Sequence, residues 1–122
     1  MKHWMVGSGK VDITPPLFVP ELGFVPRQHS FRGVHDRLTA RALALSTDTD
    51  GVLIIAADCI GFHWSLLGDH RDFVGELRRR LSRICGLTPD RIMLAATHAH
   101  STPETLCLTP FLKVPGVAEW VE

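Results

Sequence analysis

The sequence lacks features that mark several large classes of protein. No apolar run approaches the roughly 18 residues that a membrane-spanning helix needs, so no transmembrane segment is expected. Basic and acidic residues balance at 13 each, whereas a dedicated nucleic-acid-binding domain is usually basic. Residues 1–7 hold no long apolar stretch of the signal-peptide kind, which favours a cytoplasmic location.

The cysteines are few and scattered. Cys59, Cys85 and Cys107 make an odd count, and no two of them are spaced as Cys-x-x-Cys. A disulfide framework and a cysteine-rich zinc site are therefore not expected, and a reducing compartment is the simpler interpretation. Histidine, in contrast, is abundant, with seven residues in 122. It is the commonest metal ligand and titrates near neutral pH, so the histidines indicate where chemistry is to be sought.

The length fits a single domain, and the 45% hydrophobic content excludes a disordered chain. Val6–Ile13 has the pattern of a strand, and the proline-rich residues 15–36 predict an ordered loop at best. Arg37–Leu45 predicts a second strand, followed by turn residues 46–51. The continuous apolar run 52–57 is typical of a central strand that is buried on both faces. The last two strands should pair antiparallel.

A helix is predicted over Leu66–Cys85, because apolar residues recur there on one face and Gly86 is placed to end it. A second apolar strand follows at Ile92–Ala96. Strand, helix and strand form a βαβ unit, so the two strands should be parallel. The predicted fold class is α/β, with a mixed sheet that joins this unit to antiparallel N-terminal strands.

Candidate functional residues cluster where the two parallel strands end. Asp58 follows the first strand, and His98 and His100 follow the second. Carboxyl ends of parallel strands meet at one sheet edge, where open α/β sheets bind ligands. In an extended segment, residues two apart point to the same side, so both histidines could address one zinc ion or one substrate. The alternatives are hydrogen-bonded or surface histidines, and for Asp58 a turn-capping carboxylate. His35 could reach the same site, but a turn is the favoured interpretation.

Four ordered segments resemble the neutral, non-lysosomal ceramidase family. Val6–Pro16 is similar to its opening strand, which ends Asp-Ile-Thr-Pro-Pro, and Gly33–Leu43 resembles its Gly-Val-His-Asp and Ala-Arg-Ala-Leu strand. Ala57–Gly61 resembles its Ala-Asp-Leu-Leu-Gly segment. Ala96–Pro103 resembles the signature Thr-His-Thr-His-Ser-Gly-Pro. The likeness extends over about residues 6–103, and the combination is specific although each segment alone is not.

The resemblance implies a zinc-dependent amidase that cleaves N-acyl sphingosine to a sphingoid base and a fatty acid. His98 matches the family's zinc ligand, and His100 matches the residue that binds or polarises the scissile carbonyl. Thr102 stands where the signature has glycine, beside the substrate. Asp58 is a candidate for a carboxylate that supports the metal ligand without touching the metal. The implied partners are a lipid-like N-acyl substrate and the remainder of the catalytic domain, and peripheral contact with a membrane is left open.

The family's catalytic domain is several times longer than 122 residues. We therefore expect residues 1–122 to be one partial domain, the N-terminal segment and half-site of such a hydrolase, with the remaining zinc ligands elsewhere. Two other hypotheses stay open. The chain could be a non-catalytic α/β module or truncated remnant, or part of a metal hydrolase of the same family with a different acyl-amide substrate.

Overall fold

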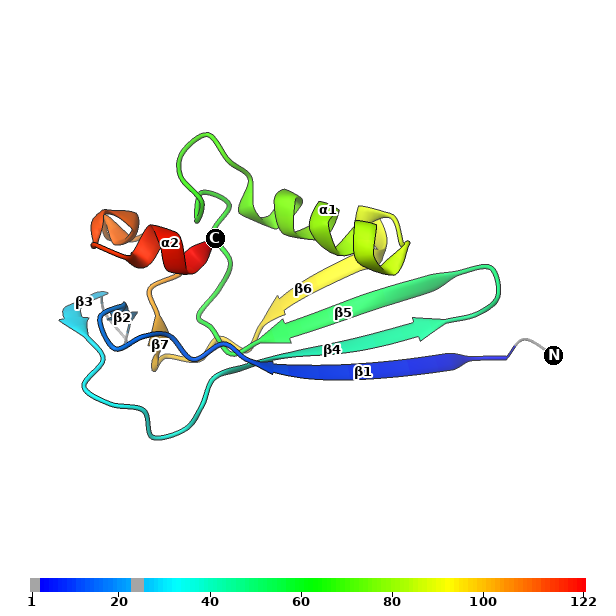
Figure 1. The fold of residues 1–122 in the computed structure, drawn as a ribbon, viewed down its shortest axis with the longest axis horizontal. Coiled ribbons are helices and arrows are strands. Elements are labelled where there is room, and N and C mark those ends of the chain that lie inside the picture. Colours follow the sequence, from blue (N-terminus) through cyan, green and yellow to red (C-terminus); the bar gives the residue numbers. More distant parts are fainter. Residues whose placement is uncertain (1–2, 23–25) are drawn as a thin grey trace.

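A four-stranded mixed sheet forms the centre of the molecule (Figure 1). The computed structural model describes residues 3–22 and 26–122. The strands, in sheet order, are β1 (Met5–Asp12), β4 (Thr39–Ser46), β5 (Gly51–Ala57) and β6 (Ile92–Ala96). β4 pairs antiparallel with both β1 and β5, and β5 pairs parallel with β6. The predicted α/β class, the βαβ unit and the antiparallel N-terminal strands are confirmed.

Helix α1 (Phe73–Cys85) joins β5 to β6 and begins seven residues later than the predicted Leu66. The Asp72 carboxylate accepts a hydrogen bond from the Gly75 amide and caps the first turn. Before it, Gly68 has a φ of 107°, a backbone conformation that no helix accommodates. The predicted end is confirmed, because Gly86 adopts the left-handed conformation (φ 75°) and its amide bonds to Ser82.

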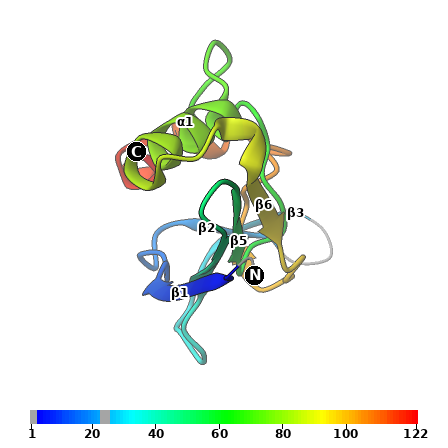
Figure 2. The same cartoon turned by 90° about the vertical axis from the view of Figure 1, so that its right-hand side faces the viewer.

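Helix α1 lies over one face of the sheet, as the two views in Figures 1 and 2 show. Leu53 and Ile92, whose side chains share that face, are 9% and 2% exposed. Residues 52–57 were expected to be buried on both faces, but in the described part of the chain Val52 and Ile54, on the face away from α1, are only half-buried. Met93, on the opposite face of β6, is 57% exposed.

A second, three-stranded sheet lies beside the end of the first. Its order is β3 (Pro26–Ser30), β2 (Pro20–Leu22) and β7 (Thr102–Pro103), all antiparallel. Residues 15–36 are thus not a loop throughout. Such short strands are stabilised by partners distant in sequence, so local patterns do not predict them.

The C-terminal segment packs against the N-terminal loop. Val19, Leu66, Phe111 and Val117 form a buried cluster that includes the first residues of the 3₁₀ helix η2 (Phe111–Lys113) and helix α2 (Val117–Val121). A further 3₁₀ turn, η1 (Pro89–Arg91), precedes β6. No helix in the described ranges has the length and apolar character to cross a membrane.

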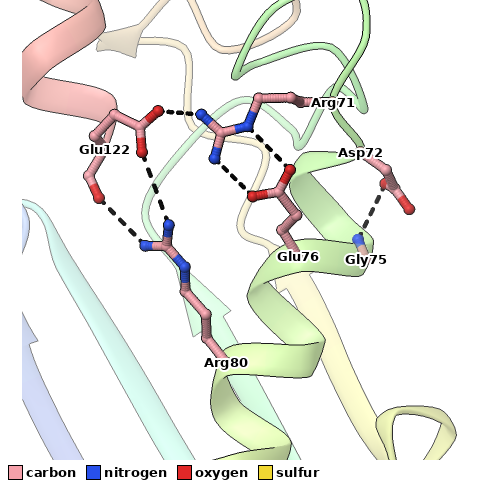
Figure 3. Close-up of polar contacts among 6 residues, drawn as sticks. All are labelled: Arg71, Asp72, Gly75, Glu76, Arg80 and Glu122. Atoms are coloured by element: carbon pink, nitrogen blue, oxygen red, sulfur yellow. Dashed lines mark hydrogen bonds and ion pairs between the residues drawn. The ribbon is translucent and has the colours of Figure 1, made fainter.

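Ion pairs join the two α-helices (Figure 3). Arg71 donates to both carboxylate oxygens of Glu76, at 3.0 and 2.6 Å, and also to Glu122. Arg80 approaches the same Glu122 carboxylate at 3.7 Å. Glu122 therefore links the end of α2 to the first turns of α1.

Candidate functional site

The predicted functional residues gather where β5 and β6 end, because the pairing of these strands continues beyond them. The Thr97 amide donates to the Ala57 carbonyl at 3.0 Å, and the Ala99 amide donates to the Cys59 carbonyl at 3.2 Å. The segment after β6 is thus held along the segment after β5. Asp58, His98 and His100 lie at one sheet edge, as the parallel arrangement predicts.

His98 is held by its backbone and by its ring. Its φ is 60°, a left-handed conformation that is uncommon for residues other than glycine and often marks functional sites. Its Nδ1 lies 2.9 Å from the Ile60 carbonyl oxygen. A carbonyl oxygen only accepts, so Nδ1 carries the proton and Nε2 has a free lone pair. This is the usual arrangement of a metal-binding histidine. The ring nitrogen that does not bind the metal donates a hydrogen bond, and this bond orients the ring.

His100 lies next to His98. Their ring centroids are 5.0 Å apart and the rings are nearly perpendicular, at 89°. The sequence argument assumed an extended segment, but the left-handed backbone at His98 breaks it. The rings are neighbours because the loop turns there. In residues 3–22 and 26–122, no group of three or more His, Cys, Asp or Glu side chains is arranged to hold a metal ion. The pair can supply at most part of a zinc site, since a catalytic zinc normally has three protein ligands.

Asp58 connects the sheet edge to β4. One carboxylate oxygen accepts hydrogen bonds from the Thr39 amide and hydroxyl, each at 2.8 Å, and the other lies 3.6 Å from Arg41. Burial alone would raise the pKa of this carboxyl. The hydrogen bonds from Thr39, the charge of Arg41 and a hydrogen bond from the Thr97 side chain outweigh it and lower the pKa. Thr97 precedes His98 directly in the chain, so this hydrogen bond connects Asp58 to the backbone that carries His98. That Asp58 supports His98 as a metal ligand stays a prediction.

Thr102 is completely buried, and its hydroxyl donates to the Ala99 carbonyl at 2.9 Å. In this structure the side chain closes the turn that carries His100. Contact between Thr102 and substrate stays a prediction.

Glu104 is a buried residue that sequence reasoning missed. Its carboxylate is fully enclosed and accepts hydrogen bonds from the Leu108 amide and from the amide and hydroxyl of Thr109. These donors satisfy the hydrogen-bonding capacity of the buried carboxyl oxygens and shape the loop after the histidines. No periodic pattern in the sequence marks the residue.

A cavity of about 660 Å³ adjoins the histidine loop. Ala99 and Ser101, on either side of His100, form one wall. Residues of the segment before β4, including Phe31 and His35, also line the cavity. The His35 ring lies 2.8 Å from the Asp36 carboxylate, and this hydrogen bond raises the pKa of His35. The sequence left open that His35 reaches the site, through its Gly-Val-His-Asp motif, but favoured a turn.

The fold and the paired histidines define this chain as an α/β domain with a candidate site at the carboxyl ends of its parallel strands. No family model matches it. It is similar, however, to neutral ceramidases from Drosophila melanogaster and Drosophila pseudoobscura pseudoobscura, each 28% identical over 102 residues. The matches cover 82% of this chain and only 14% of each relative.

Solved structures agree with these matches. Neutral ceramidase from Pseudomonas aeruginosa superposes with a TM-score of 0.64 at 26% identity, covering 82% of this chain and 16% of that one. A ceramidase complexed with C2 gives a TM-score of 0.66 at 24% identity, with 82% and 15% covered, which supports the fold alone. Over 82% of its length the chain is thus similar to one region of the neutral ceramidases, and the resemblance seen in its motifs is confirmed.

Proposed function

We propose that this chain is the histidine-bearing part of a zinc-dependent amide hydrolase that acts on N-acyl sphingosine. The observation that carries the proposal is the His98 ring. Its Nδ1 is bound to the Ile60 carbonyl, its Nε2 is left for a metal, and it lies beside His100 in a fold shared with ceramidases. The relatives are named for ceramide hydrolysis, and the chain spans only 14% of their length.

The proposed roles of the two histidines are those that the family resemblance implies. His98 is the proposed zinc ligand. A bound zinc lowers the pKa of water and polarises a carbonyl, which is the chemistry that amide hydrolysis needs. His100 is the proposed residue that binds the scissile carbonyl and donates to the oxyanion that forms from it. The cavity that Ala99 and Ser101 line is the proposed site for the polar end of the substrate. The remaining ligands would come from the rest of a ceramidase-length protein.

Zinc content tests the metal assignment. The polypeptide that the native gene encodes is purified as wild type, as His98→Ala and as His70→Ala, and zinc is measured by mass spectrometry. We expect about one zinc per chain in the wild type and in His70→Ala, whose side chain is exposed in the loop before α1. His98→Ala should lose most of it. Equal zinc in both variants would refute the assignment.

Substrate class is tested on the same preparations. Hydrolysis of N-acyl sphingosine is compared with that of other acyl amides, and His100→Ala is expected to lower the rate by about 100-fold or more, the usual effect of removing an oxyanion donor. If only another acyl amide is hydrolysed, the hydrolase assignment stands and the sphingolipid substrate is rejected. A wild type that holds no zinc and hydrolyses none of them would favour a non-catalytic module.

A further inference from the structure

The sheet face opposite α1 is apolar and open. Strand register places the side chains of Val6 and Leu45 together, then Leu43 and Ile54, and then Ile54 and Met93, all on this face. Val6 is 68% exposed, Met93 57% and Leu43 39%. We call this surface, which Trp4 and Val52 complete, the bare face. Figures 1 and 2 both show α1 on the other side of the sheet.

The bare face has the composition of an interior. β5 is a continuous apolar run, a pattern typical of strands covered on both sides, and α1 covers one side only. Four strands of eight, eight, seven and five residues give a sheet footprint on the order of 500 Å². An open apolar surface of this size on a soluble protein usually marks an interaction site.

Charged groups are confined to one end of the same face. Lys10 and Arg41 are register partners there, and Asp58 lies 3.6 Å from Arg41. This end adjoins the histidines, while the apolar residues extend away from them. A layer that packs on the apolar part can therefore cover the sheet and leave the histidine edge accessible.

We propose that the bare face packs against a second layer of polypeptide, the apolar side of further secondary structure within a ceramidase-length protein. The same fold makes up only 16% and 15% of the two solved ceramidase chains, so in them it is a small part of a larger body. Two copies of this chain packed face to face would bury on the order of 1,000 Å², the lower limit for a specific interface. This inference shares one requirement with the proposed function, which is that the chain is part of a ceramidase-length protein. It does not depend on zinc binding or on activity.

Thiol labelling tests the interface without using activity or metal. Leu43→Cys and Met93→Cys are each introduced into the polypeptide that the native gene encodes, and labelling by a maleimide is followed by peptide mass spectrometry. Cys85, exposed at the end of α1, is the internal reference for an accessible thiol. Cys59 is buried, and burial raises its pKa, so its slow labelling verifies that each variant is folded.

We expect the thiols introduced by Leu43→Cys and Met93→Cys to label at least ten-fold more slowly than Cys85 at every protein concentration. Labelling as fast as at Cys85 would overturn the proposal. Protection that disappears on dilution would overturn it in favour of a second copy. A loss of zinc or activity with intact protection would count against the proposed function and leave this inference standing.

Discussion

At the scale of single residues, His98 depends on a segment distant in sequence. Its left-handed backbone is followed by a hydrogen bond from the Ala99 amide to the Cys59 carbonyl, and its ring is oriented by the hydrogen bond to the Ile60 carbonyl. These contacts all come from the residues that follow β5. The geometry of the candidate ligand is therefore a property of two strand ends, although the histidine pair is visible in the sequence.

Asp58→Asn is predicted to remove stability in a pH-dependent way. The pKa of Asp58 is lower in the folded chain than the value of about 4 in an unfolded one. Its contribution is thus complete above that value and is lost as pH falls through the folded pKa. We expect Asp58→Asn to lower the free energy of unfolding by about 1–3 kcal/mol at pH 7, because its donors lose a charged acceptor.

Urea unfolding from pH 7 down to pH 3 measures this effect. The difference between wild type and Asp58→Asn should shrink below about pH 4, where the wild-type carboxyl also becomes neutral. Asp48→Asn, in the exposed turn between β4 and β5, is the matched control. A difference that is constant across this range would contradict the assigned cause.

At the scale of elements, the start of α1 was decided by its cap. The apolar spacing continued back to Leu66, but Leu66 belongs to the C-terminal core cluster and the helix begins after Asp72. Periodicity identifies a helix better than its ends, because caps and turns use a few polar residues and glycines.

Asp72→Ala is predicted to destabilise the chain by about 1 kcal/mol, the typical effect of losing an N-cap side chain. The measurement is the urea midpoint at pH 7, with Asp69→Ala, exposed three residues earlier, as the control. A Cβ added at Gly75 would clash with the Asp72 carboxylate. Gly75→Ala should therefore destabilise wild type and stabilise the Asp72→Ala background. Equal effects in both backgrounds would disprove the capping geometry.

The link between α1 and α2 gives a second prediction at this scale. Glu122→Gln weakens the ion pairs with Arg71 and Arg80 shown in Figure 3. Amide hydrogen exchange in Val117–Val121 should become faster, while exchange in β5 stays the same. Added salt should reduce the difference, because exposed ion pairs are screened. Faster exchange throughout the chain would instead indicate a global effect.

At the scale of the whole molecule, the buried core cluster of the described residues lies outside the four-stranded sheet. The most deeply buried side chains join the C-terminal segment to the N-terminal loop, whereas β1 is exposed along its length. Within the described residues, the sheet is thus covered by α1 on one face and open on the bare face.

This asymmetry predicts that replacing large side chains by alanine has unequal effects in the two regions. Phe111→Ala, at a position 1% exposed, should lower the free energy of unfolding by about 3–5 kcal/mol. Leu43→Ala, at 39% exposed, should cost well under half of that when only residues 1–122 are present. Chemical denaturation of the two variants compares them directly. Equal losses would show that Leu43 is covered.

The sequence by itself determined the α/β class, the βαβ unit, the end of α1 and the edge that carries Asp58, His98 and His100. These depend on local periodicity and on the rule that parallel strands end together. Only the tertiary structure decided the later start of α1, the small second sheet, the enclosed Glu104 and the place of His35 beside the cavity. Each of these depends on contacts between residues far apart in the chain, which local patterns do not encode.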